Sequence, residues 1–154
     1  MGSRTPVMIG VDGMSAGEPF VLAYDTPVTI GRSRECEISM QKLRRYLELS
    51  EAERNASTVV NAVSRKHLRV CVSGTIAKLE NLSPNGSWCD DARFDQVKHV
   101  DLAAGQVTLR VSPGESFVLM LMEQEQIERL LAKTQMYFPV PSTRVEPPRP
   151  PSGM

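Results

Sequence analysis

The stretch from Ser64 to Trp88 reads SRKHLRVCVSGTIAKLENLSPNGSW, and it decides the fold. Polar and apolar residues alternate over positions 67–72 and again over 75–80. Period-two alternation puts every second side chain on the same face of an extended chain, so each run predicts a β-strand with one buried face. The Ser-Pro-Asn-Gly segment that follows is typical of a turn. We therefore expect two short strands followed by a turn.

The same strand signals continue on both sides of this stretch. Before it, β-forming runs are separated by Gly13, Gly17 and Pro19, and after it lie one alternating run and one wholly apolar run. Together these runs cover positions 7–9, 20–24, 28–30, 106–111 and 117–122. Short strands at this spacing predict an all-β sandwich of about eight to eleven strands.

Two segments carry a helical pattern instead. Over about 41–60, apolar residues recur three and four apart among good helix formers, beginning at Leu43. This spacing predicts a helical insertion between strands. Over about 123–137, apolar residues from Ile127 onward share one helical face. We expect this second segment to form a C-terminal helix that packs on the sandwich.

Length, charge and composition exclude several classes of protein. With 154 residues and 17.1 kDa, the chain fits one domain. Its 18 basic and 18 acidic side chains balance, which argues against a general nucleic-acid binder. The three cysteines show no CxxC spacing, so we expect no metal site and no disulfide framework. We also expect no cofactor. The longest apolar run, six residues over 117–122, is too short for membrane insertion.

Prolines mark the end of the folded body. Six of the eleven prolines lie between Pro139 and Pro151. We therefore expect a domain over residues 5–138 and an extended, disordered tail or linker over 139–154. The PxxP spacing in this tail also suits an SH3-like groove, and a linker leaves open that the chain is part of a longer multidomain protein. No cationic segment precedes an apolar one at the N-terminus, so we expect no signal peptide and a cytoplasmic location.

Three polar turns carry the residues with functional chemistry. Gly31-Arg32 follows a predicted strand, Ser64 to His67 leads into the next, and Ser-Pro-Asn-Gly-Ser begins at Ser83. Each alone is typical of an ordinary turn or of a solvated strand edge. In this order within an all-β chain, Gly-Arg, Ser-x-x-His and Ser-x-Asn-Gly-Ser resemble the motifs of the forkhead-associated (FHA) domain family.

This resemblance covers about residues 7–122. It implies an FHA/SMAD-like β-sandwich of about eleven strands that binds phosphothreonine-containing segments of a Ser/Thr kinase substrate through loops at one end. Arg32 matches the family's phosphate-binding arginine, and Ser64 matches the serine of the phosphate cradle. Arg65 matches a position that contacts the phosphate or the peptide, and Asn85 matches the residue that clamps the peptide main chain. The chemistry is suitable, because a guanidinium fork can bind the oxygens of a phosphate carrying about −1.5 to −2 charge.

The other matches are expected to support the site structurally. Gly31 is expected to let the backbone turn so that Arg32 points out of the sandwich. His67 is expected to brace the binding loops by hydrogen bonding rather than to act as a ligand or base. Gly86 is expected to complete the turn that follows Asn85.

The chain departs from the family pattern in two places. Pro84 stands where many relatives carry a side chain able to touch the peptide, and proline offers neither an N–H nor a polar side chain. The segment between Ile38 and Ser64 is far longer than in typical relatives. This insertion is either a helical excursion packed on the side of the sandwich or an extra wall that alters peptide choice or blocks the site.

Three alternative functions are compared with phosphopeptide recognition: catalysis, phosphate-independent interaction and self-recognition. Catalysis is not expected, because Ser64 and His67 lie on a turn and a strand that send their side chains in different directions, and no Walker-type loop is present. The main rival is a phosphate-independent interaction or self-association domain of the same fold, although the joint presence of all the phosphopeptide-binding matches favours phosphate recognition. Alternatively, Thr5 or Thr143 could be phosphorylated and occupy a neighbouring domain's site, or both could be plain disordered sequence.

Overall fold

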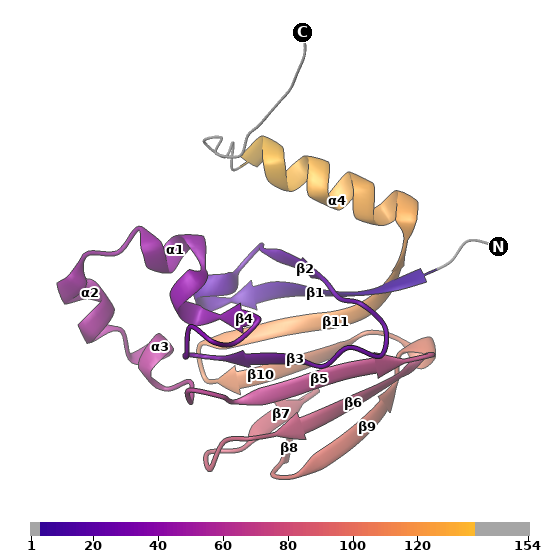
Figure 1. Cartoon of the computed structure of the whole chain (residues 1–154), viewed down its shortest axis with the longest axis horizontal. Coiled ribbons are helices and arrows are strands. Elements are labelled where there is room, and N and C mark those ends of the chain that lie inside the picture. Colours follow the sequence, from indigo (N-terminus) through magenta and orange to yellow (C-terminus); the bar gives the residue numbers. More distant parts are fainter. Residues whose placement is uncertain (1–3, 138–154) are drawn as a thin grey trace, which may run out of the picture.

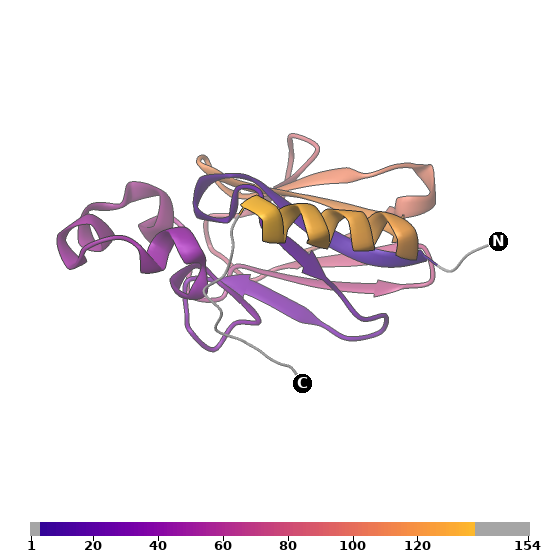
Figure 2. The ribbon, with the colours of Figure 1, turned by 90° about the horizontal axis from the view of Figure 1, so that it is seen from above.

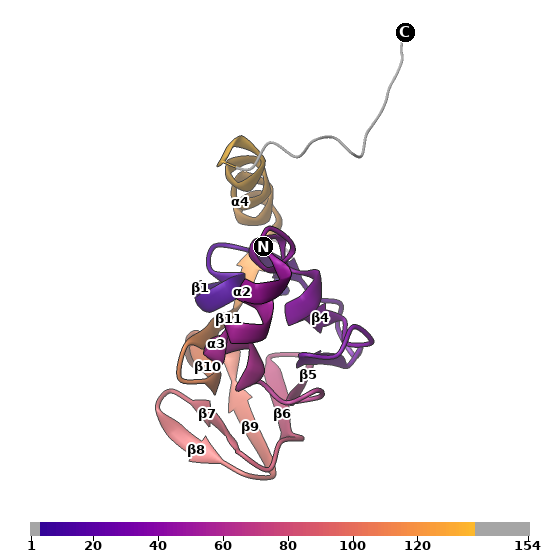
Figure 3. The same cartoon turned by 90° about the vertical axis from the view of Figure 1, so that its left-hand side faces the viewer.

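Two β-sheets face each other in the computed structural model, which describes residues 4–137, with side chains described as far as Lys133 (Figures 1 and 3). One sheet has six strands in the order β2-β1-β11-β10-β7-β8, and the other has five in the order β4-β3-β5-β6-β9. The predicted all-β sandwich of about eleven strands is confirmed. The strands are β1 (Arg4–Asp12), β2 (Pro19–Val21), β3 (Val28–Gly31), β4 (Ile38–Ser39), β5 (Leu68–Ser73), β6 (Ile76–Asn81), β7 (Ser87–Cys89), β8 (Ala92–Phe94), β9 (Val97–Asp101), β10 (Val107–Ser112) and β11 (Glu115–Glu123).

The core lies between the sheets and follows the alternation read from the sequence. In β5, Leu68, Val70 and Val72 are buried while the residues between them are only half-buried. From the opposite sheet, Leu109 of β10 and Phe117 of β11 are fully buried. Burial of such side chains contributes about 1.5–3 kcal/mol each. This core holds the strand ends, and therefore the loops between them, in fixed positions.

The expected helical insertion is present between β4 and β5. It comprises the 3-10 turn η2 (Met40–Lys42) and three short helices, α1 (Arg44–Leu47), α2 (Glu51–Ala56) and α3 (Thr58–Asn61). Helix α2 begins at a capping box, because the Ser50 side chain accepts from the Glu53 amide and the Glu53 side chain accepts from the Ser50 amide. Figures 1 and 2 show the three helices at the end of the sandwich where β3 finishes and β5 begins.

The insertion is attached to the sandwich at several points. The guanidinium of Arg45 donates to the backbone carbonyl of Ala16, in the loop between β1 and β2. Val60 is buried, and Val59 lies directly against Gly114 in the turn between β10 and β11. These contacts fix the insertion against two loops of the six-stranded sheet, as the first of its two interpretations requires.

A C-terminal helix, α4 (Gln124–Tyr137), follows β11 directly, as predicted. Its contact with the sandwich is narrower than the sequence pattern suggests, because Ile127 is buried whereas Leu131 is 39% exposed. Figure 1 shows α4 running above β1 and β2. Within the described residues, no helix has the length and apolar character needed to cross a membrane. The tail over 139–154, including Thr143 and its PxxP spacing, lies outside the described residues, so the division of the chain at residue 138 stays a prediction.

Candidate functional site

The order of strands in the five-stranded sheet brings the three polar turns together. Because β3, β5 and β6 are neighbours, the loop after β3, the turn before β5 and the turn after β6 meet at one end of the sandwich. Backbone bonds join the first two: the Arg32 amide donates to the Ser64 carbonyl at 2.9 Å, and the Ser33 amide to the Arg65 carbonyl at 3.0 Å. The loops are therefore held in register where the sheet pairing ends.

His67 links the second turn to the third. Its imidazole is fully buried; Nδ1 accepts from the Ser64 backbone amide at 3.0 Å, and Nε2 lies 2.8 Å from the Gly86 carbonyl oxygen. A ring nitrogen that accepts carries no proton, so the proton is on Nε2 and is donated to Gly86. Burial lowers the pKa of His67, which favours this neutral form.

Ser83 connects Ser64 with Asn85. It is a buried residue whose Oγ lies 2.6 Å from the Ser64 Oγ and accepts from the Asn85 backbone amide at 3.0 Å. A hydroxyl has one proton to give. When Ser83 gives its proton to Ser64, the Ser64 proton is free for a ligand. The sequence motif contained Ser83, but the sequence alone assigned it no role.

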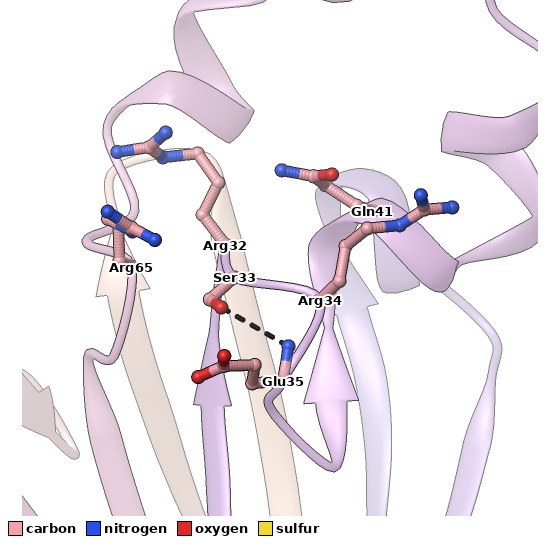
Figure 4. A pocket seen from close by; sticks show the side chains of 6 residues that line it. All are labelled: Arg32, Ser33, Arg34, Glu35, Gln41 and Arg65. Atoms are coloured by element: carbon pink, nitrogen blue, oxygen red, sulfur yellow. Dashed lines mark hydrogen bonds between the residues drawn. The ribbon is translucent and has the colours of Figure 1, made fainter.

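A surface pocket of about 410 Å³ lies beside these turns. Arg32 and Arg65 present their guanidinium groups on one side of it, and Arg34 and Gln41 lie on the other (Figure 4). Ser33 and Glu35 complete the lining. Three arginines and one carboxylate give this pocket an excess of positive charge.

The side chain of Arg32 is held by one bond and is otherwise available. Its Nε donates to the Val63 carbonyl at 3.0 Å, so the stem has a fixed direction. Within residues 4–133, neither terminal nitrogen of Arg32 forms a hydrogen bond or an ion pair. A guanidinium anchored through Nε leaves its other N–H groups for an anion.

Gly31 is needed for a different reason from the expected one. It lies in β3 and does not have a positive φ, so the expectation that it provides an unusual backbone turn is wrong. A Cβ at this position would lie 2.2 Å from the Arg65 carbonyl oxygen. Only glycine therefore lets the Arg32 loop approach the Arg65 turn closely enough for the backbone hydrogen bonds between them to form.

The third turn, from Ser83 to Gly86, is closed by a backbone hydrogen bond, and none of its residues lines the pocket. The Gly86 amide donates to the Ser83 carbonyl at 3.1 Å, and Gly86 has a φ of +81°, as its expected turn role requires. Pro84 and Asn85 are exposed at its tip. The structure thus brings Arg32 and Arg65 into one pocket and places Ser64 beside it, whereas Asn85 lies on the adjoining turn.

Sequence reasoning missed two polar groups on the far side of the pocket. Arg34 lies only two residues after Arg32 in the same loop, so its proximity was available from the sequence. Gln41 opens the helical insertion, and its place beside the pocket depends on how that insertion folds. No group of three or more His, Cys, Asp or Glu residues suited to a metal ion occurs in the part of the chain that the structure describes.

Comparison with known proteins identifies the family. The family model described as the FHA domain matches residues 28–110, more than half of the chain. The chain belongs to the FHA domain family. The matched span begins with β3 and contains every candidate site residue, together with the insertion. No curated protein matches the chain.

Solved FHA domains share the fold at low sequence identity. The FHA domain of the CT664 protein of Chlamydia trachomatis superposes with a TM-score of 0.55 at 13% identity, covering 75% of this chain and 96% of that one. An FHA domain of an Arabidopsis thaliana hypothetical protein gives 0.54 at 19% identity, covering 80% and 90%. A third, from a study of phosphothreonine-dependent FHA domain interactions, gives 0.52 at 18% identity, covering 75% and 95%. FHA domains are recognition modules.

Proposed function

We propose that this FHA domain binds phosphothreonine-containing segments of protein partners through the arginine-lined pocket and the turns beside it. The observation that carries this proposal is the state of the pocket arginines. Within the described residues, Arg32, Arg34 and Arg65 form no ion pair, although the chain as a whole is neutral. Three like charges around one pocket repel one another, and a bound anion relieves that repulsion.

The contrast with the rest of the surface supports this interpretation. Five other arginines each lie within 4 Å of a carboxylate oxygen: Arg44, Arg69, Arg93, Arg110 and Arg129. Acidic partners are thus available on this surface, whereas the pocket arginines form no ion pair among the described residues, although Glu35 lines the same pocket. A phosphate monoester, with about two negative charges and three acceptor oxygens, suits the open forks of Arg32 and Arg65.

The neighbouring turns suit a peptide that carries such a phosphate. Ser64 lies beside the pocket and can donate its hydroxyl proton when Ser83 donates to it. The Asn85 side chain is exposed on the next turn and makes no hydrogen bond within the described residues. An amide offers both donors and an acceptor, which matches a peptide main chain. The FHA domain studied for its phosphothreonine-dependent interactions supports the same assignment by its fold.

We expect no catalytic activity from this domain. The only hydrogen bond between Ser64 and His67 runs from the Ser64 backbone amide to Nδ1, so the Ser64 hydroxyl does not face a general base. A nucleophile and its base must be within hydrogen-bond reach.

The cytoplasmic location stays a prediction.

Self-recognition through Thr5 is disfavoured by its place in the fold. Thr5 lies within β1 and is paired with Met122 of β11, so it is not part of a disordered segment. Binding to a neighbouring domain would require this end of the strand to unpair. We therefore propose a partner protein, and not this threonine, as the ligand.

The test is calorimetry of the full chain with matched peptides. A phosphopeptide library first selects a sequence, and the selected peptide is then made with phosphothreonine, threonine or alanine at the central position. We expect micromolar binding, about −8 kcal/mol, for the phosphothreonine form only. Equal affinity for all three peptides would instead support a phosphate-independent interaction domain.

A further inference from the structure

An exposed threonine lies in the loop between β2 and β3. Residues 23–27 of this loop are all exposed, whereas the residues on either side of the run are buried. Thr26 belongs to no strand or helix, and its Oγ1 donates to the Tyr24 carbonyl at 3.1 Å. Because Pro27 follows, extended backbone conformations are favoured at Thr26. A hydroxyl on an exposed, irregular segment is accessible to a protein kinase.

The other threonines whose side chains the structure describes are less suited to modification. Four of them are half-buried, in strands or in a turn: Thr5, Thr29, Thr75 and Thr108. Thr58 is exposed, but it is the first residue of helix α3, and its carbonyl accepts from the Ala62 amide. Within residues 4–133, Thr26 is therefore the threonine that combines exposure with an irregular backbone.

Thr26 and the arginine-lined pocket lie at opposite ends of the sandwich. Strand β3 begins after the loop that holds Thr26 and ends directly before Arg32. In Figure 1 this loop lies at the end away from the helical insertion. With a rise of about 3.3 Å per residue, the strand separates Thr26 from Arg32 by roughly 20 Å. A phosphate on Thr26 therefore cannot reach the pocket of its own chain, but it can enter the pocket of another copy.

The two ends also carry opposite charge, although the chain as a whole is neutral. Asp25 lies in the loop itself, and Asp101 and Glu123 end strands β9 and β11 at the same end of the sandwich. Arg4 is paired opposite Glu123, and its carbonyl accepts from the Tyr24 hydroxyl at 2.7 Å, which places this strand pair beside the loop. The pocket at the other end is lined by three arginines and one carboxylate. Charge complementarity thus favours a second copy of the chain as the partner.

We propose that Thr26 is a phosphorylation site, and that phosphorylated Thr26 of one copy binds the arginine-lined pocket of the next. A Ser/Thr kinase transfers the γ-phosphoryl group of ATP to Oγ1: the new P–O bond forms, the bond to the bridging oxygen of ADP breaks, and the hydroxyl proton is released. The bond to the Tyr24 carbonyl is lost with that proton. This inference rests on the proposed function, because the pocket must bind phosphothreonine.

The geometry determines what kind of assembly results. Each copy has its ligand and its pocket at opposite ends, so the contact is head-to-tail and can continue beyond a dimer. The contact is confined to the phosphate and residues 23–27, because the chain from Val28 onward is paired in β3. No strand has to unpair for this contact, in contrast to binding through Thr5.

The experiment uses the full chain with phosphothreonine incorporated at position 26, measured by sedimentation velocity. At about 300 µM, well above the micromolar Kd expected for the pocket, the unmodified chain should remain a 17.1 kDa monomer. The phosphorylated chain should exceed the mass of a dimer, and high salt should reverse this assembly. A chain with phosphothreonine at position 58 is the matched control and should stay monomeric.

A mixing experiment tests the head-to-tail contact directly. The phosphorylated chain with Arg32→Ala has a ligand but no working pocket, and the unmodified wild type has a pocket but no ligand. Each should be monomeric alone, and their mixture should form a dimer that grows no further. Two results would overturn this inference alone: a phosphorylated chain that stays monomeric although wild type binds the selected peptide, or equal assembly of the control phosphorylated at position 58. Failure of wild type to bind any phosphothreonine peptide overturns the proposed function itself.

Discussion

The backbone amide of Ser64 donates a hydrogen bond of 3.0 Å to Nδ1 of His67, three residues further along the chain. The other ring nitrogen of the same imidazole lies 2.8 Å from the carbonyl oxygen of Gly86. One buried side chain therefore joins two of the turns that surround the candidate phosphate site. Because Nδ1 accepts, the link exists only while the imidazole is neutral.

Lowering the pH should destabilise the domain through His67. Burial lowers the pKa of His67 in the folded state below its ordinary value of 6.5. Below pH 6.5 the unfolded chain takes up a proton that the folded chain does not, so the free energy of unfolding decreases until the folded pKa is reached. We expect the stability difference between wild type and His67→Gln, measured by urea unfolding, to shrink as the pH falls below 6.5. A difference that is constant from pH 7.5 to pH 5 would contradict this.

Ser83 should matter both for stability and for binding. Ser83→Ala removes the partner of the Ser64 hydroxyl and of the Asn85 amide, which costs about 1–3 kcal/mol of unfolding free energy. We also expect the affinity for a phosphothreonine peptide to fall several-fold, because Ser64 and Asn85 lose their common support. Ser112→Ala is the matched control, since the buried Ser112 hydroxyl has no hydrogen-bond partner among the described residues. Equal effects of the two substitutions would show that Ser83 has no special role.

Gly31→Ala should disturb the loop that carries Arg32. The new Cβ would lie 2.2 Å from the Arg65 carbonyl oxygen, and a backbone atom cannot move aside without breaking the bonds between the two loops. We expect a loss of about 1–3 kcal/mol in unfolding free energy and weaker phosphopeptide binding.

Gly114→Ala provides the comparison for that substitution. Its Cβ would lie 2.9 Å from a Val59 methyl carbon, which is a side-chain atom that can shift. We expect a smaller loss of stability, measured by denaturant unfolding, and no change in phosphopeptide affinity. If Gly31→Ala is as mild as Gly114→Ala, the close approach of the two loops does not depend on glycine.

Much of the fold could be predicted from the sequence because it depends on local periodicity. The alternation over 67–72 and 75–80 became β5 and β6, and the spacing after Leu43 and Ile127 became helices. The extent of contact made by α4 could not be predicted in this way. A helix pattern indicates which residues share a face, but not how closely the chain leaving β11 brings that face to the sheet.

The candidate site was only partly accessible to sequence reasoning. Short motifs marked Arg32, Ser64 and Asn85, because a family resemblance fixes such positions along the chain. The sequence did not reveal Gln41 beside the pocket, since that depends on the path of an insertion. It also suggested the wrong reason for Gly31, because a close approach between two loops distant in sequence leaves no local signal.

The most direct test of phosphate recognition is calorimetry of Arg32→Ala with the selected phosphothreonine peptide. Losing the anchored guanidinium removes charge-assisted hydrogen bonds worth about 1.5–3 kcal/mol each, so we predict at least about a ten-fold loss of affinity. The fold should persist, because the described structure ties the Arg32 side chain to the sandwich only through the Nε bond to Val63. Arg129→Ala serves as the control and should bind like wild type. An Arg32→Ala variant that remains folded and binds with wild-type affinity would contradict the account.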